Sequence, residues 1–155
     1  ALGGGVLPIA AVIARADLDV AGDFAIGHYT HEMNPVTARA ALTTLEIIED
    51  EGLVERSARL GERAMGRLRT SLGQIAHVGD IRGRGCMFGV EIVTDRDSRT
   101  PDPARAEAVY YACLAEGLSF KISAGNVLTL SPPMTIAQED LDRALAIVEV
   151  AIGAV

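Results

Sequence analysis

The sequence predicts an α/β chain in which the part from about residue 77 onwards is an α+β unit. In that unit, helices pack on one face of a small, mainly antiparallel sheet. Three observations predict this fold. Hydrophobic residues make up 49% of the 155 residues, which is ample for a packed core. An N-cap residue followed by proline, a helix-start signal, occurs at Asn34-Pro35 and again at Asp102-Pro103. Short apolar runs of strand length alternate with helical patterns.

The first predicted element is the apolar run 6–14, which has the length of a buried strand. A glycine turn, residues 1–5, precedes it, and a polar loop, residues 27–34, lies between it and the first helix signal. No other segment of the chain is an identifiable sheet partner for this run. Because unpaired backbone groups and bare apolar faces are costly, we expect the chain to be a piece of a larger protein.

A long helix is predicted from Asn34-Pro35 to Gly73. We expect it to bend or break at Gly52 and Gly61, since glycine inside a helix costs about 1 kcal/mol relative to alanine. Its apolar residues recur at helical spacing. They are Ala41, Leu45, Ile48, Leu60, Ala64, Leu68 and Leu72.

Two short extended runs follow, residues 77–81 and 86–94, and Arg82-Gly83-Arg84-Gly85 separates them. The second run is apolar apart from Glu91, which is typical of a strand covered on both faces. These two runs are the first strands of the predicted sheet.

The remaining elements are a helix over residues 103–115, two paired strands at 118–123 and 127–130, and a last helix. Thr135 with Gln138 three residues later forms a capping-box signature at the start of that helix. The last helix is predicted to bury Leu141, Leu145, Val148 and Ile152.

Charge and composition exclude several classes of protein. The net charge of -7 argues against a nucleic-acid partner, which requires a basic surface. No apolar run reaches the roughly 18 residues of a membrane span. Cys86 and Cys113 lie in apolar patterns and predict two small buried side chains rather than a disulfide framework or a zinc site. A reducing cytoplasm is the expected location.

Four segments of the chain carry a resemblance to a known family. They are residues 1–9, 30–35, 79–91 and 126–133. In this order they resemble successive landmarks of the class III aminotransferases, pyridoxal-phosphate enzymes related to ornithine and 4-aminobutyrate aminotransferases. Residues 79–93 are especially similar to the branch that contains dialkylglycine decarboxylase. The resemblance covers nearly the whole chain.

The resemblance implies the C-terminal part of an aspartate-aminotransferase-like fold. Residues 1–34 would end the large cofactor-binding domain, residues 35–75 would form a long interdomain helix, and residues 76–155 would form the small C-terminal domain. In this family the Schiff-base lysine immediately precedes the turn that begins at Ala1. The chain is therefore expected to be inactive by itself, with no catalytic residue of its own. Lys121, the only lysine, is expected to be a surface residue.

The resemblance also implies residues that contact the cofactor, pyridoxal 5'-phosphate. Thr30 matches the threonine whose hydroxyl and backbone reach the cofactor phosphate of the neighbouring subunit. His28 and Tyr29 would line the same loop. Hydroxyl and amide groups are suitable donors to a phosphate dianion. Two chains would thus complete each other's active sites, so a homodimer is expected. The alternative role for Thr30 is to cap a turn.

The substrate-binding residues implied are Arg82, Arg84 and Thr129. Many family members hold the substrate carboxylate with an arginine at the position of Thr129. A hydroxyl cannot make the bidentate, charge-assisted pair that a guanidinium makes with a carboxylate. Either Arg82 or Arg84 replaces that arginine, or the amino donor binds differently. A structural role remains open for both arginines, in pairs with Asp80 or with a carbonyl.

No metal site is predicted. His28, His31 and Glu32 are close in sequence, but their spacing fits neither the helical zinc signature nor a zinc ribbon. In the decarboxylase branch this loop helps to hold an alkali-metal ion. Thr30, Glu32 and Asn34 occupy the matching positions, although Asn34 stands where that branch has an acidic ligand.

The implied function is transfer of an amino group from an amine or amino acid to a 2-oxo acid. Pyridoxal phosphate is the cofactor, and the partners are a second copy of the chain and small-molecule substrates. One alternative is a decarboxylase of the dialkylglycine type. The other is a free-standing α+β module that binds a metabolite or a protein without catalysis.

Overall fold

The computed structural model describes residues 2–24, 27, 30, 32 and 34–155. The chain divides into two compact units, Ala1–Gly52 and Leu53–Val155, which are described separately here. No helix in the part of the chain that the model describes is long and apolar enough to cross a membrane.

The described residues of the first unit form a short 3-10 helix, η1 (Ala16–Leu18), and an α-helix, α1 (Pro35–Asp50). The segment 6–14, predicted to be a strand whose partners lie outside this chain, has no strand assignment here. Val12 and Ile13 are 94% and 97% exposed. A strand requires a partner for its backbone N–H and C=O groups, and the described residues of this unit provide none.

Helix α1 begins as its sequence predicts. The Asn34 side chain accepts a hydrogen bond from the Val36 backbone N–H at 2.9 Å, and Pro35 occupies the first helical position. The helix ends before Gly52, whose φ of 57° lies in the left-handed region that suits glycine. The predicted break at Gly52 is confirmed. The predicted bend at Gly61 is wrong, since this glycine lies inside a regular helix of the second unit.

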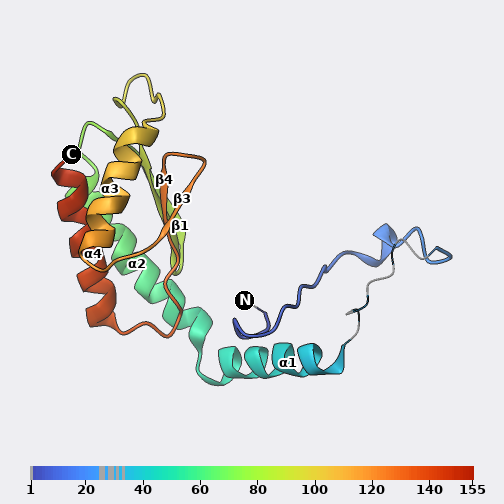
Figure 1. The fold of residues 1–155 in the computed structure, drawn as a ribbon. Helices are drawn as coiled ribbons and strands as arrows, with labels where there is room; N and C mark the ends of the chain where they lie inside the picture. The colour runs from blue at the N-terminus through green and yellow to red at the C-terminus, as the bar shows by residue number, and fades with distance from the viewer. Residues whose placement is uncertain (1, 25–26, 28–29, 31, 33) are drawn as a thin grey trace. The chain divides into compact units, whose positions relative to one another are not determined.

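Three helices and four strands make up the second unit (Figure 1). Their bounds are α2 (Leu53–Leu72), β1 (Val78–Arg84), β2 (Met87–Ile92), α3 (Pro103–Ala115), β3 (Lys121–Ser123), β4 (Val127–Leu130) and α4 (Gln138–Gly153). The sheet order is β1-β2-β4-β3, and each neighbouring pair is antiparallel. This confirms the predicted antiparallel sheet.

Two boundaries differ from the sequence prediction. Arg82, Gly83 and Arg84 continue β1 instead of separating two strands, and the turn is confined to Gly85 and Cys86. The glycine at position 85 has a φ of 55°, which is why the reversal can be so short. Strand β3 is also shorter than predicted, with three residues.

The two later helices differ in how they start. Asp102 caps α3 by accepting a hydrogen bond from the Arg105 backbone N–H at 3.0 Å, as predicted. The predicted capping box of α4 is wrong. The N-cap residue is Ala137 and makes no side-chain cap, because the helix starts at Gln138 and so leaves Thr135 outside its first turn.

The core lies between the sheet and the helices, which Figure 1 shows on one side of the strands. Alternate strand residues, including Phe88, Val90 and Leu128, face this core. Both cysteines are buried, as predicted, and burial raises the pKa of the Cys113 thiol to about 11. The apolar residues predicted on α2 and α4 are also buried: Leu60, Ala64, Leu68, Leu72, Leu141, Leu145, Val148 and Ile152.

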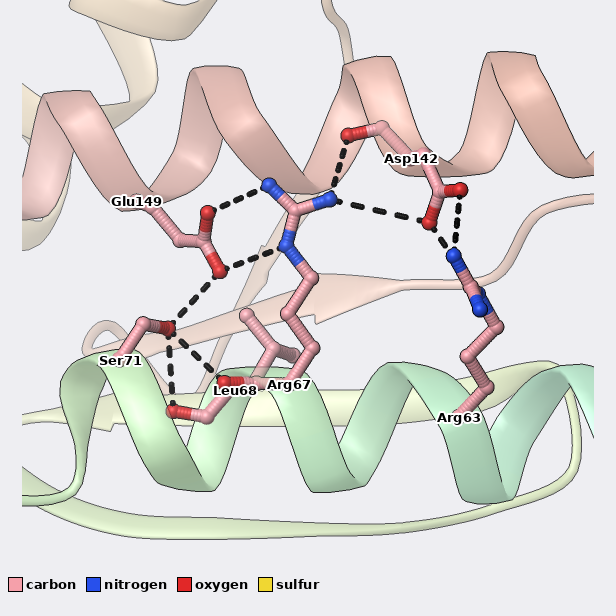
Figure 2. A network of polar contacts seen from close by, with 6 residues as sticks. All are labelled: Arg63, Arg67, Leu68, Ser71, Asp142 and Glu149. Carbon is pink, nitrogen blue, oxygen red and sulfur yellow. Dashed lines mark hydrogen bonds and ion pairs between the residues drawn. The ribbon is translucent and has the colours of Figure 1, made fainter.

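A polar network joins α2 to α4 along the edge of this core (Figure 2). The Arg67 guanidinium donates to both carboxylate oxygens of Glu149, at 2.9 and 2.6 Å, and to the backbone carbonyl of Asp142 at 3.0 Å. Ser71 also donates to Glu149, at 2.8 Å, and Arg63 pairs with the Asp142 side chain at 2.8 Å. These bonds fix the two helices against each other.

Candidate functional site

The register of the sheet places the predicted substrate-binding residues on one face. Arg82 lies opposite Gly89, Gly89 opposite Thr129, and Thr129 opposite Lys121, so one row crosses all four strands. Directly paired residues share a face of the sheet. Helices α2, α3 and α4 pack on the opposite face. Within the second unit, the row therefore lies on the face without helices.

A hollow of about 280 Å³ opens on this face, and we call it the open-face hollow. Its lining residues are Arg82, Gly83, Arg84, Met87, Phe88, Gly89, Val127 and Thr129. The structure thus brings together all three predicted substrate-binding residues. Gly89 contributes to the hollow by having no side chain, since a Cβ there would lie 3.0 Å from Cγ1 of Val127.

The two arginines of the hollow differ in their partners. Arg82 donates from Nη1 to Asp80 at 3.0 Å and to Glu91 at 3.1 Å. The hydrogen bond to Asp80 is the largest cause of the raised pKa of Arg82, with a further contribution from Glu91. Among the described residues, Arg84 has no carboxylate within 4.0 Å. Arg84 is therefore the cation whose donors remain available at this hollow.

Thr129 contributes a half-buried hydroxyl from the middle of the sheet. Its Oγ1 donates to Ser123 Oγ at 2.9 Å and approaches the Val127 carbonyl at 3.4 Å. These contacts orient the hydroxyl along the strands. Lys121, at the end of the same row, is exposed on the short edge strand β3.

The loop before α1 is described only in part. Thr30 lies in a turn and is exposed, whereas the candidates His28 and Tyr29 lie outside the described residues. Asn34 uses its side-chain oxygen to cap α1. Among the described residues, no group of three His, Cys, Asp or Glu side chains could hold a metal ion. His31, considered above with Glu32, lies outside that set.

Sequence comparison decides the family. The model of the family described as "Aminotransferase class-III" matches residues 1–152. The chain belongs to the class III aminotransferases. The structural neighbours agree, and the fold is therefore that of a pyridoxal-phosphate-dependent transaminase, in which this chain contains a small α/β domain.

Relatives of this class III aminotransferase chain differ in reaction. It is 45% identical to an (R)-1-hydroxy-2-aminoethylphosphonate ammonia-lyase of Vibrio splendidus (strain 12B01), with 99% of this chain and 32% of that protein covered. It is 41% identical to a leucine/methionine racemase of Thermococcus litoralis, with 98% of this chain and 34% of the racemase covered. The chain thus spans about a third of the length of these curated relatives.

One solved neighbour bears on the cofactor. It is an amine transaminase from an uncultivated Pseudomonas species in its PLP-bound form. It is 29% identical, has a TM-score of 0.76, and is matched over 83% of this chain and 30% of its own. Membership of the family implies pyridoxal phosphate as the cofactor.

The described residues fit part of a phosphate site for this cofactor. Thr30 offers an exposed hydroxyl just before a helix, which is a suitable donor to phosphate. Among the described residues, no buried side-chain nitrogen or oxygen lacks a hydrogen-bond partner. There is consequently no enclosed set of unpaired donors within this part of the chain. The donor chemistry fits a contribution from Thr30 to a phosphate site, not a complete pocket.

Sequence reasoning missed part of the open-face hollow. It identified Arg82, Arg84 and Thr129, but not Gly89 or the pairing of Arg82 with Glu91. One sequence signal for this face was present. Asp80, Arg82 and Arg84 are spaced two residues apart, which places their side chains on the same face of a strand. The register with β2 was needed to show which residues these side chains meet.

Proposed function

We propose that the protein that carries this chain is a pyridoxal-phosphate-dependent aminotransferase. It would move an amino group from an amine or amino acid to a 2-oxo acid, as a homodimer in the cytoplasm. The observation that carries the proposal is the open-face hollow, which Arg84 and Thr129 both line, in a chain of the class III family. When bound, pyridoxal phosphate supplies an electron sink for the bond that is broken at the amino carbon.

This chain would supply binding groups to that site. Thr30 would donate to the cofactor phosphate, and His28 and Tyr29 would lie beside it. Arg84 would bind the acidic group of the substrate, because its donors remain available, while Asp80 and Glu91 hold Arg82 in place. Thr129 would contact the substrate through its hydroxyl.

The proposal includes the division of the chain into the three expected domain parts. It also includes the parts of the protein that would cover their exposed apolar side chains. Residues 1–34 would belong to the large domain, residues 35–75 to the interdomain helical segment that was predicted as one long helix, and residues 76–155 to the small domain. The exposed apolar side chains of the first unit support this division, since such groups are normally covered. Val12, Ile13, Phe24 and Leu45 are examples. The large domain and a second subunit would cover them.

The test of function uses the complete protein that contains these residues. Product formed from a candidate amino donor should depend on added 2-oxo acid. Arg84→Gln should raise KM for the acidic substrate by about tenfold with little change in kcat, because it removes a charge-assisted hydrogen bond made in the ground state. Arg59→Gln, an exposed arginine on α2, is the matched control.

The outcomes of this assay separate the candidate functions. A KM equal to wild type in Arg84→Gln would contradict the assigned role of this arginine. Release of carbon dioxide from the donor would indicate the dialkylglycine type of decarboxylation. No turnover with amines, amino acids or 2-oxo acids would favour the non-catalytic module.

A second candidate reaction is elimination of ammonia. The specific observation in its favour is the 45% identity to an ammonia-lyase. A lyase would release ammonia from the donor without any 2-oxo acid. An aminotransferase would retain the nitrogen and pass it to the acceptor. Measuring ammonia with and without the acceptor distinguishes the two.

A further inference from the structure

A second hollow, of about 250 Å³, lies beside the start of strand β1. We call it the arginine hollow, after three of its lining residues, Arg69, Arg96 and Arg99. Arg69 comes from the last turn of α2, and the other two come from the loop that follows β2. The arginine hollow shares no lining residue with the open-face hollow.

Backbone carbonyls hold two of these guanidinium groups. Arg96 donates to the Gly73 carbonyl, and Arg99 donates to the Gly79 carbonyl at 3.4 Å. A guanidinium has five N–H donors, and each of these hydrogen bonds uses one of them. Both side chains are therefore oriented while most of their donors stay available.

The loop that carries Arg96 and Arg99 is closed by its own hydrogen bonds. The Asp95 carboxylate accepts from the Ser98 hydroxyl at 2.6 Å and from the Ser98 backbone N–H at 2.8 Å. The Thr94 N–H donates to the Thr100 carbonyl at 2.9 Å. These bonds fix the backbone of the loop that carries the two arginines. Ligand binding therefore costs little further conformational entropy of this loop.

The arginine hollow has an excess of positive charge. Among the described residues, Arg69, Arg96 and Arg99 have no carboxylate within 4.0 Å. Asp80 also lines the hollow, but it is paired with Arg82 at 3.0 Å. The C-terminal end of α2 contributes about half a negative charge. Three arginines and one aspartate thus line the same hollow, on a chain whose net charge is -7, while Asp95 and Asp97 of the same loop are not among the lining residues.

We propose that the arginine hollow binds a phosphoryl dianion, as inorganic phosphate or as the phosphate group of a small monoester. A bound dianion would offset the mutual repulsion of the three guanidinium groups. Phosphate presents several oxygens in a tetrahedral arrangement, so it can accept from more than one of the arginines that line the hollow. A carboxylate has two oxygens in one plane and matches a single guanidinium. The proposal does not depend on the proposed reaction.

The test is a titration of the isotope-labelled chain with inorganic phosphate at constant ionic strength, followed by amide NMR shifts. We expect saturable shifts at Gly73, Gly79 and Arg96–Arg99. Arg69→Gln should weaken the affinity about tenfold, because a hydrogen bond to a charged group is lost. Arg69 is exposed and makes no side-chain hydrogen bond or ion pair with the described residues, so this variant should keep its circular dichroism spectrum.

Arg59→Gln is the matched control, since it removes an exposed arginine from the same helix and should leave the affinity unchanged. A parallel titration with glycerol 3-phosphate identifies the source of the ligand. Binding of both compounds indicates a monoester group, and binding of inorganic phosphate alone indicates the free ion. Shifts that avoid the arginine hollow, or an affinity that is equal in Arg69→Gln and wild type, would overturn the proposal.

Discussion

Glu149 is a carboxylate under two opposing influences. Burial alone would raise its pKa, because a charged group loses solvation. Hydrogen bonds from Arg67 and Ser71, together with the charge of Arg67, outweigh burial and lower the pKa from its ordinary value of 4.5. The same bidentate contact raises the pKa of Arg67. The ionised pair is therefore the form that stabilises the contact between α2 and α4.

A pH dependence of stability follows from the lowered pKa. The stabilisation is complete above about pH 4.5 and is lost as the pH falls through the lower pKa of the folded state. Glu149→Gln should reduce the free energy of unfolding by about 1–2 kcal/mol at pH 7. The difference from wild type should shrink towards pH 3.

Urea unfolding at several pH values measures this effect. Glu62→Gln, at an exposed position of α2, serves as the control and should change stability little. A constant difference between Glu149→Gln and wild type from pH 7 to pH 3 would show that the carboxylate charge does not contribute.

Residue-scale prediction succeeded where the chemistry is local. Asn34 and Asp102 could be assigned as caps, because a cap bonds to a neighbour two or three residues away. The pairing of Arg82 with Asp80, which the sequence left open as an alternative to substrate binding, is local in the same way. The second partner of Arg82, Glu91, lies on another strand, so its contact depends on the register of β1 with β2. Sequence alone does not specify that register.

Among the elements, helix α2 lies close to the turn that joins β1 to β2. A Cβ at Gly61 would overlap the backbone carbonyl of Gly85. Next to this contact, the Cys86 backbone N–H donates to the Ser57 hydroxyl at 2.9 Å. The absence of a side chain at position 61 thus allows helix and turn to touch backbone to backbone.

Two alanine substitutions in α2 test this contact. Gly61→Ala should destabilise the fold by about 2 kcal/mol or more, because the new methyl group has no space unless the backbone moves. Gly66→Ala, five residues later, meets nothing within 4 Å. It should stabilise the helix by up to about 1 kcal/mol, owing to the better helix propensity of alanine.

Thermal or urea unfolding of both variants provides the measurement. Equal effects of the two substitutions would mean that the close approach of Gly61 and Gly85 is not required for stability.

The type of most elements could be predicted, but some boundaries could not. Helical spacing identified the buried face of α2, because its apolar side chains all meet one core. The start of α4 was misplaced. The capping-box pattern at Thr135 predicted an earlier start. In the structure, Arg56 donates hydrogen bonds to the carbonyls of Met134 and Ile136, and these bonds hold the segment before α4 in a non-helical form. Such a contact joins residues about 80 positions apart.

Over the second unit as a whole, arginines connect segments that are distant in sequence. Arg56 bonds to the segment before α4, Arg67 to α4 itself, and Arg96 to the end of α2. A planar guanidinium with five donors can bond to several acceptors, which a lysine does less well. Lys121 is the only lysine, and it contacts none of these segments by a hydrogen bond among the described residues.

The position of Lys121 leads to a prediction for the 155-residue chain by itself. Mixed with an equimolar amount of pyridoxal phosphate and reduced with borohydride, the chain should keep its intact mass. The physical reason is that Lys121 is an exposed residue at a sheet edge, whereas a Schiff-base lysine is activated by its surroundings.

Intact mass spectrometry reads out this experiment, with Lys121→Gln as the reference. A reduction-stable adduct at Lys121 would contradict the expectation that the chain has no Schiff-base lysine of its own.

Both outer strands of the sheet are short or irregular, and this has a consequence for solubility. Strand β3 has three residues, and β1 has an irregular register between Val78 and Asp80. Beyond that point β1 carries Arg82 and Arg84, whose charges oppose close pairing with an identical strand. Such borders are poor templates for cross-β growth. The second unit should therefore resist amyloid fibril formation, even at high protein concentration.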